Sequence, residues 1–408
     1  MQLILINNHN PNRLMKKTLI FIAAIGLLLG ACERAPENEI MNDDQGFVKN
    51  ITTPIPGQYV VVLKPDMSLV KSGAISFDES QLAMATRVQK LLTASGISGR
   101  TPLQVYSVAL EGFAINLTDS EVAELRNNPS VAEVCQDMEL ILAQPNTSAS
   151  AQAAQVTPPG ITRVGGGATY TGTGKIWIID TGIDLDHPDL NVNTTLAKTF
   201  VSRTKSADDD NGHGSHCAGI AAAKNNSVGV VGVAAGAPVV PVKVLDRSGS
   251  GAYSTIIAGV NYVAGYATPG DAVNMSLGGT AYSALDNAII TMAGKGLYVS
   301  LAAGNSAADA NNYSPARVNG STIWTVSACN SSDAWASFSN YGNPPIDYCA
   351  PGVSIYSTYK NGGYATMSGT SMAAPHMCGV LLATGGKPTT SGYVTGDPDG
   401  KADPIVHE

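Results

Sequence analysis

A glycine turn that leads into an apolar, alanine-rich stretch, residues 369–376, is the feature that most constrains how this chain folds. Gly369 lets the backbone turn sharply and the small alanines allow close packing, so the segment predicts a helix that begins at the turn. Ser371 then lies among unpaired helix N–H groups, at the positive end of the helix dipole. A serine placed there could attack a carbonyl, although taken alone it is more typical of a helix N-cap.

Two further segments place an aspartate and a histidine upstream of this serine. Residues 175–179 form an apolar run that predicts a buried strand, and Asp180 stands at its C-terminal end, where open α/β sheets carry their sites. Residues 211–219 predict a second small-residue helix with His213 in its first turn. The chemistry-bearing residues therefore follow one another along the chain as Asp, His and Ser.

Short blocks around these three residues resemble the signature segments of the subtilases. The blocks are residues 178–182, 212–216 and 369–373. Further segments resemble the proteinase K-like branch in the same order, namely residues 245–259, 302–305 and 336–342. Three separated blocks in one order make a chance match very improbable.

The resemblance implies an α/β fold in which a mostly parallel sheet carries helices on both faces, as in subtilisin. It also implies a catalytic triad of Asp180, His213 and Ser371. Asn305 would be the side-chain donor of the oxyanion hole. Taken alone, Asn305 is better explained as a loop residue in a turn after Gly304, but its position in residues 300–305, after an apolar strand, favours the oxyanion role.

Other acids, histidines and a cysteine near the three residues are rivals for their roles. Asp184, Asp186 and Asp189 are interpreted as solvated loop carboxylates, and His187, His216 and His376 as structural histidines. Cys217 lies one turn after His213, which could indicate a metal pair. No further ligand stands at zinc spacing, so Cys217 is interpreted as a buried thiol behind the site.

The resemblance also implies two walls of a substrate groove. One is an exposed edge to which an extended peptide adds as a strand, formed by Ser248, Gly249, Ser250 and Gly251, with Tyr253 at a more distant subsite. The opposite wall and the specificity pocket comprise Leu277, Gly278, Ala303 and Gly304. Backbone pairing implies broad specificity, with a preference for apolar or aromatic residues before the cleaved bond. Ordinary turns would explain the same glycine clusters.

The N-terminal residues predict export from a bacterial cell. Residues 1–32 are interpreted as a secretory signal whose natural start is Met15. Its end resembles a lipobox, which would lipidate Cys32, although an ordinary signal with a chance cysteine is the alternative. Residues 33–57 are polar and proline-containing, which is typical of a tether.

A small α+β module, residues 58–143, resembles the ferredoxin-like inhibitory prodomain of subtilases. Residues 144–154 are small and polar, as in a cleavable linker, and we expect the mature enzyme to begin near residues 150–154. The peptidase domain is predicted over residues 155–385, followed by a polar C-terminal tail, residues 386–408. Self-cleavage would then separate a released enzyme from a lipid-anchored precursor.

Calcium is the expected cofactor class, for stability only, and no catalytic cofactor is expected. Asp397, Asp399 and Asp403 surround a glycine turn, as oxygen ligands of calcium do, while a solvated acidic tail explains them equally well. Asp347 resembles a calcium-binding aspartate of the family. Export permits disulfides, and the favoured pair is Cys329 with Cys349, although connectivity does not follow from sequence.

Charge and composition narrow the function. The formal net charge of −8 and the lack of basic runs argue against a nucleic-acid partner. The prediction is a secreted, monomeric serine endopeptidase that acts on polypeptides and is inhibited by its own prodomain. A catalytically inactive subtilase scaffold, acting as a binding lipoprotein, is the alternative, and a serine esterase is chemically conceivable.

Overall fold

A computed structural model describes residues 50–66, 76–143, 148–150 and 154–408. All of these belong to one of the chain's two structural units, Gly46–Glu408. The predicted signal, Cys32 and most of the predicted tether lie outside the described residues. No helix within the described ranges is both long and apolar enough to cross a membrane.

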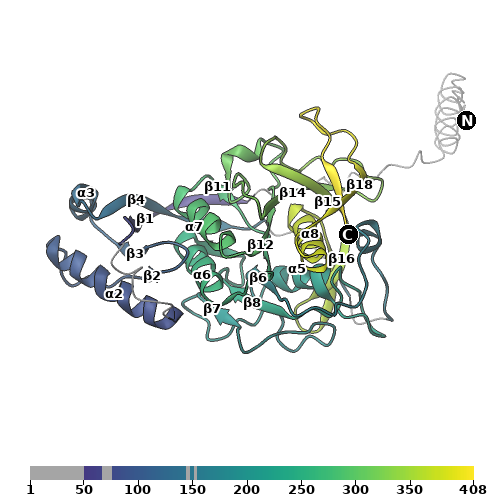
Figure 1. The fold of residues 1–408 in the computed structure, drawn as a ribbon, viewed down its shortest axis with the longest axis horizontal. Coiled ribbons are helices and arrows are strands. Elements are labelled where there is room, and N and C mark those ends of the chain that lie inside the picture. The colour runs from purple at the N-terminus through teal and green to yellow at the C-terminus, as the bar shows by residue number, and fades with distance from the viewer. Residues whose placement is uncertain (1–49, 67–75, 144–147, 151–153) are drawn as a thin grey trace, which may run out of the picture. The chain divides into compact units, whose positions relative to one another are not determined.

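A mostly parallel sheet forms the centre of the predicted peptidase domain (Figure 1). Among the described residues it has nine strands, in the spatial order β18 (Thr389–Tyr393), β19 (Pro404–His407), β15 (Ile346–Pro351), β14 (Ile323–Cys329), β12 (Tyr298–Ala302), β10 (Ala272–Met275), β6 (Ile176–Asp180), β8 (Val239–Lys243) and β7 (Lys198–Thr199). Each neighbouring pair from β19 to β7 is parallel, and the edge pair β18 and β19 is antiparallel. The predicted α/β class is confirmed.

Helices cover both faces of this sheet, and the alternating side chains of β6 show why. Ile176 and Ile178 belong to one apolar cluster and Trp177 and Ile179 to another, because successive residues of a strand point to opposite faces. The first cluster includes residues of α5 (His213–Ala222) and α8 (Thr370–Thr384), and the second includes residues of α6 (Tyr253–Tyr266) and α7 (Ser283–Ala293). Figure 1 shows the two helix pairs on opposite sides of the strands.

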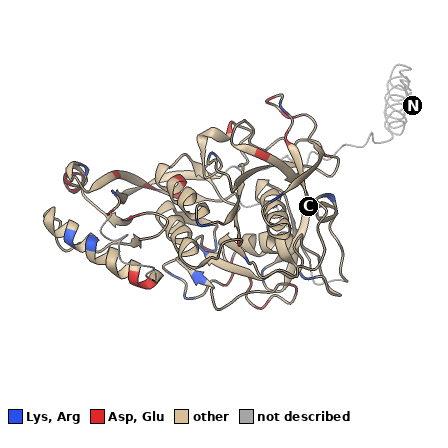
Figure 2. Ribbon diagram, in the orientation of Figure 1, with Lys and Arg blue, Asp and Glu red and all other residues tan. Residues whose placement is uncertain are grey.

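Shorter elements connect these layers and carry much of the site. They are β5 (Ser148–Ser150), α4 (Pro159–Arg163), β9 (Ser250–Ala252), β11 (Gly279–Thr280), η1 (Ala310–Asn312), β13 (Tyr313–Ser314), β16 (Ile355–Tyr359) and β17 (Gly363–Met367). Figure 2 shows few charged residues on the central strands, which are buried on both faces.

The predicted prodomain is a βαββαβ unit with its own apolar cluster, in agreement with the α+β module expected from sequence. Its elements are β1 (Ile51–Leu63), α2 (Phe77–Ala94), β2 (Gln104–Tyr106), β3 (Gly112–Asn116), α3 (Asp119–Asn127) and β4 (Val131–Ile141). Both helices begin with a capping box, in which a hydroxyl and a glutamate each bond to a backbone N–H of the other residue. The sheet order is β2-β3-β1-β4-β9, so the prodomain sheet continues onto a strand of the peptidase domain.

Two predicted segments differ from the structure. The described end of the predicted tether, from Ile51 onward, is the first half of β1 and pairs with β4. The predicted polar tail is also wrong, because β19 pairs with β15 and buries Ile405 and Val406. Two apolar residues in a polar segment are too short a signal to predict a sheet strand from sequence.

The predicted disulfide is also wrong for this structure, in which Cys329 and Cys349 are free, buried thiols. They lie on adjacent parallel strands, but the register pairs Cys349 with Ser327 and Cys329 with Pro351. The two cysteines are therefore offset by two residues along the strands, and their side chains are neighbours in one apolar cluster, joined by a hydrogen bond and not by a disulfide.

Candidate active site

Asp180 is the last residue of β6 and is fully buried. Its backbone carbonyl accepts hydrogen bonds from Val244 N (2.9 Å) and Leu245 N (3.2 Å), which fix the end of the strand. The chain then turns through Gly182, whose φ of 106° favours glycine, and runs on towards the loop before α5. The carboxylate is thus held at the carboxyl end of the sheet, as predicted.

His213 is the first residue of α5 and lies against Asp180. Its Nδ1 is 2.8 Å from Oδ1 and 2.9 Å from Oδ2 of the carboxylate. A carboxylate only accepts hydrogen bonds, so Nδ1 carries a proton and, in the neutral ring, Nε2 is the basic nitrogen. Burial acts to lower the pKa of His213, but the charge and hydrogen bond of Asp180, helped by the charge of Asp209, outweigh it and the pKa is raised.

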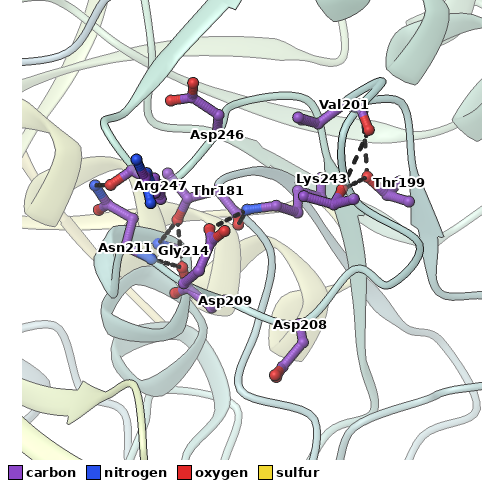
Figure 3. Close-up of polar contacts among 12 residues, drawn as sticks. Thr181, Thr199, Val201, Asp208, Asp209, Asn211, Gly214, Lys243, Asp246 and Arg247 are labelled. Carbon is purple, nitrogen blue, oxygen red and sulfur yellow. Dashed lines mark hydrogen bonds and ion pairs between the residues drawn. The ribbon is translucent and has the colours of Figure 1, made fainter.

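A second buried carboxylate, Asp209, ties the turn after Asp180 to the start of α5 (Figure 3). Its Oδ1 accepts hydrogen bonds from Thr181 Oγ1 (2.9 Å), Asn211 N (3.0 Å) and Gly212 N (2.8 Å). Its Oδ2 accepts from Ser215 N (2.9 Å) and Ser215 Oγ (2.7 Å). The negative charge also suits the N-terminus of a helix, so Asp209 fixes the position of His213 relative to the strand end.

Lys243 supports the same turn through a side chain that reaches Thr181 and is fully buried (Figure 3). Its ammonium donates to the carbonyl of Thr181 and forms an ion pair of 2.6 Å with Asp210. In the sheet register Lys243 is the direct neighbour of Asp180. A buried ammonium needs such partners, since an unpaired one would be strongly destabilising.

Ser371 is the second residue of α8, after a Gly369 whose φ is 151°. Pro375, one turn later, has no N–H to donate to the carbonyl of Ser371. Ser276 Oγ (2.8 Å) and Cys217 Sγ (3.4 Å) donate to that carbonyl instead. The backbone of the serine is thus anchored from two other segments, while its Oγ donates to the carbonyl of Ser276 at 3.1 Å.

Asn305 lies beside the start of α8. Its Oδ1 accepts hydrogen bonds from Thr370 N and Thr370 Oγ1, both at 2.9 Å. With the oxygen engaged in this way, the two N–H bonds of the amide remain for another acceptor. A narrow pocket brings together Asn305, His213 and Ser371, with Leu142 and Ala143 of the prodomain.

A larger pocket of about 240 Å³ adjoins Ser371. It includes all four residues predicted for the second wall, Leu277, Gly278, Ala303 and Gly304. Tyr313 and Ala316, which the sequence did not single out, line it as well. The pocket is therefore open to a side chain of modest size next to the serine.

The predicted first wall is occupied by the prodomain. Strand β4 pairs with β9 in antiparallel register, Ile141 opposite Ser250 and Leu140 opposite Gly251. The pairing continues past β9, where Leu142 N donates to the carbonyl of Gly249 at 3.0 Å. Ser248 lies in the turn before this edge, where its hydroxyl donates to Asp246.

Tyr253, predicted at a distant subsite, is fully buried and does not face open solvent. Its hydroxyl donates to the carbonyl of Thr280 at 2.9 Å, and its ring packs edge-on against Tyr282. Burial raises the pKa of the Tyr253 phenol, so it stays protonated. In the structure this tyrosine therefore links the two walls of the groove.

The rival histidines and cysteine have structural surroundings. Burial lowers the pKa of His216 to about 3 and that of His376 to about 4, so both rings are neutral. Burial raises the pKa of the Cys217 thiol well above its ordinary value. Asp180, His213 and Cys217 form the one cluster of possible metal ligands found among the described residues, but a protonated thiol is a poor ligand for zinc.

The charges of Asp347, Asp397 and Asp399 act on Asp403, but no three of these four aspartates, all predicted to bind calcium, form a cluster of metal ligands in the described part of the chain. Burial raises the pKa of Asp403 to about 7, and the charges of Asp397, Asp399 and Asp347 add to the effect. Burial raises the pKa of Asp347 to about 6. Ser327 Oγ donates to Asp403 at 2.6 Å, and Asn343 Nδ2 donates to Asp399 at 3.0 Å.

Sequence reasoning missed the roles of Asp209 and of Ser276 as supports of the site. Asp209 stands in an acidic run, residues 208–210, and nothing in that run distinguishes the buried carboxylate from its neighbours. Ser276 stands just before Leu277 and Gly278, and this segment predicts only a groove wall. Their contacts join segments far apart in the chain, which local patterns do not report.

Comparison with known proteins agrees with this architecture. Residues 173–386 match the Subtilase family, and residues 58–143 match Peptidase inhibitor I9. The "Extracellular serine proteinase" of Thermus sp. (strain Rt41A) is 36% identical over 380 residues, 90% of this chain and 89% of the relative. "Subtilisin NAT" of Bacillus subtilis subsp. natto is 39% identical over 323 residues, 76% of this chain and 79% of the relative.

A solved structure gives the same answer for the fold. The crystal structure of a cold adapted subtilisin-like serine proteinase aligns with a TM-score of 0.54 at 35% identity, and the alignment covers 61% of this chain and 97% of that one. The chain therefore belongs to the subtilase family of serine proteinases and carries an inhibitor I9 prodomain.

Proposed function

We propose that the protein is an exported serine endopeptidase in which Ser371 attacks the peptide carbonyl, His213 accepts its proton and Asp180 orients the imidazole. The observation that carries this proposal is the contact between Asp180 and His213, which leaves Nε2 as the base in a pocket shared with Ser371. The raised pKa of His213 means that the imidazolium formed during attack is stabilised.

The serine hydroxyl must turn before it reacts. In the structure Ser371 Oγ donates to the carbonyl of Ser276, while the prodomain fills the groove. Catalytic hydrogen bonds are often loose until a substrate is in place, and rotation about χ1 would direct the proton to Nε2 of His213. The proton then passes to the leaving amine when the bond breaks.

Asn305 and the start of α8 would stabilise the oxyanion. The Asn305 amide has its oxygen engaged by Thr370, which directs its N–H bonds elsewhere. The backbone N–H of Ser371 lies in the first turn of α8, where helices have no internal acceptor. Two such donors would hold the negative oxygen of the tetrahedral intermediate.

The first substrate would be the chain itself. Leu142 and Ala143 lie in the active-site pocket at the end of the strand that pairs with β9. We expect the bond that follows Ala143 to be cleaved first, upstream of the start expected from sequence at residues 150–154. Strand β5 supports this position, because it already pairs with β17 inside the peptidase domain.

Export of this protein is supported by its similarity to a relative named as an extracellular serine proteinase. Anchoring of the precursor through Cys32, and release of the enzyme after cleavage, remain predictions. Broad specificity with an apolar or aromatic preference is a further proposal, based on backbone pairing along β9 and on the pocket beside Ser371.

Calcium would suit the aspartate region at the β15 edge. Burial opposes the ionisation of Asp347 and Asp403, and Asp397 and Asp399 add negative charge beside Asp403, so a hard dication would relieve both effects. The role would be structural only. Chelation should lower the Tm of the enzyme and leave labelling of the serine at permissive temperature unchanged.

Casein cleavage and a serine-reactive phosphonate test the proposed activity. The wild-type enzyme should cleave casein and be labelled at Ser371, and Ser371→Ala should do neither. Ser332→Ala is a matched control, because this serine is exposed in a turn. A folded wild-type protein that neither cleaves nor is labelled would instead favour the binding lipoprotein.

A further inference from the structure

Strand β1 begins well before the segment that matches the inhibitor family. The match starts at residue 58, whereas β1 starts at Ile51. The additional residues follow β4 towards the active site, with Ile51 opposite Ile141 and Thr52 opposite Leu140. Figure 1 shows the purple first part of β1 reaching β11, and the two strands are in contact.

Asn50 links the end of the prodomain to the second wall of the groove. Its Oδ1 accepts a hydrogen bond from Ala143 N at 2.9 Å, and its Nδ2 donates to the carbonyl of Gly278 at 2.8 Å. The Asn50 side chain therefore binds two backbone groups at once: the N–H of Ala143, at the active site, and the carbonyl of Gly278, in the groove wall. Asn50 also lines both pockets beside Ser371.

Thr52 makes the next contact along the same wall. Thr280 N donates to Thr52 Oγ1 at 3.2 Å. The approach is so close that a Cβ on Gly279 would lie 2.1 Å from Thr52 Oγ1. Residues 50–52 thus lie between β4 on one side and residues 278–280 on the other.

We propose that residues 50–52 are a second inhibitory strand, which occupies the wall at residues 278–280 while β4 occupies β9. The proposal rests on the proposed peptidase function, because it concerns access to the same groove. A polypeptide strand that paired with this wall would compete for the carbonyl of Gly278 and the amide of Thr280, which Asn50 and Thr52 already bind. The prodomain therefore closes both walls, and the enzyme becomes active only when both strands leave.

Hydrogen exchange in the full chain carrying Ser371→Ala tests the contact without requiring catalysis. Thr52→Ala should speed exchange of the Thr280 amide by about twofold to tenfold, the effect of one net hydrogen bond. Thr53→Ala is the matched control, because Thr53 is the exposed neighbour. Thr52→Ser retains the acceptor and should restore the protection. Equal exchange in all these variants would overturn the proposal.

The lag before peptidase activity tests inhibition by this strand. In the chain with an intact Ser371, Asn50→Ala and Thr52→Ala should each shorten the lag after self-cleavage about twofold to tenfold, and Thr53→Ala should not. Faster exchange with an unchanged lag would overturn the inhibitory role. A wild-type chain that never becomes active would overturn the peptidase function, while the exchange measurement would still decide whether the strand protects the wall.

Discussion

The helices of the prodomain and those of the active site begin in opposite ways. Helices α2 and α3 each start with a capping box, built by Ser76 with Glu79 and by Thr118 with Glu121. Helices α5 and α8 start after glycines and have no side-chain cap at the N-cap position. The prodomain helices are thus stabilised by residues three positions apart, while the active-site helices depend on other segments.

This difference separates helices whose first turns contribute to stability from helices whose first turns contribute to catalysis. A capping box engages backbone N–H groups at the helix start, so these groups are not available to a substrate. At α8 the first-turn N–H groups lie beside Ser371, and Asn305, from the loop after β12, supports the turn through Thr370. At α5 the support comes from Asp209 and, across the sheet edge, from Asp180. Changes at the uncapped ends should therefore alter catalysis, and changes at the capped ends should alter stability.

The largest effect is expected for Asp180→Asn. An amide at this position can donate to Nδ1 of His213 and so favour the wrong tautomer, which should lower kcat about 10⁴-fold. Asp186→Asn, in the exposed loop that follows, is the control and should leave kcat unchanged. Steady-state kinetics on a peptide substrate measures both, and a small loss in Asp180→Asn would contradict the role given to the carboxylate.

Asn305→Ala should lower kcat about 10²- to 10³-fold, because one donor to the oxyanion is lost. The same change removes the acceptor for Thr370 N, which could also loosen α8. Asn305→Asp separates the two effects, since it keeps the acceptor and removes the donor. We expect Asn305→Asp to lose activity. Its Tm should lie between that of Asn305→Ala and that of the wild type. Full activity in Asn305→Asp would contradict the oxyanion role.

Asp209→Asn should have a smaller effect on rate and a clear effect on pH dependence. Asp180 and Asp209 are the negative charges that raise the pKa of His213. Activity needs the neutral imidazole and is lost as pH falls through that pKa, so removing one charge should move the acidic limb of the kcat profile to lower pH. A variant that loses Tm without moving this limb would show that Asp209 supports the helix only.

Sequence patterns predicted the parts of this comparison that are local. The strand before Asp180 and the turns before His213 and Ser371 are short, continuous signals, and the structure places all three residues in one region. The contact of Asp209 with Thr181 depends on how distant segments pack. The same holds for the register that offsets Cys329 from Cys349 by two residues and for the pairing of β1 with β4. Those features depend on tertiary structure, which the local pattern of apolar and polar residues does not predict.

The smallest effect is expected at a capped end. Thr118→Ala removes the hydroxyl that accepts from Glu121 N, so hydrogen exchange of the α3 amides should quicken by an amount equivalent to about 1 kcal/mol. Thr118→Ser keeps the hydroxyl and should behave like the wild type. The mature enzyme should keep its kcat, because α3 belongs to the prodomain.

The cap of α3 also predicts a pH effect on the stability of the prodomain. The hydrogen bond from the Thr118 backbone lowers the pKa of Glu121. The stabilisation by this carboxylate is therefore present above the usual glutamate pKa and is lost as pH falls through the lowered pKa. The α3 amides should therefore lose protection from hydrogen exchange in acid. A Thr118→Ala variant whose mature enzyme lost kcat would contradict the division between capped helices, which contribute to stability, and uncapped helices, which contribute to catalysis.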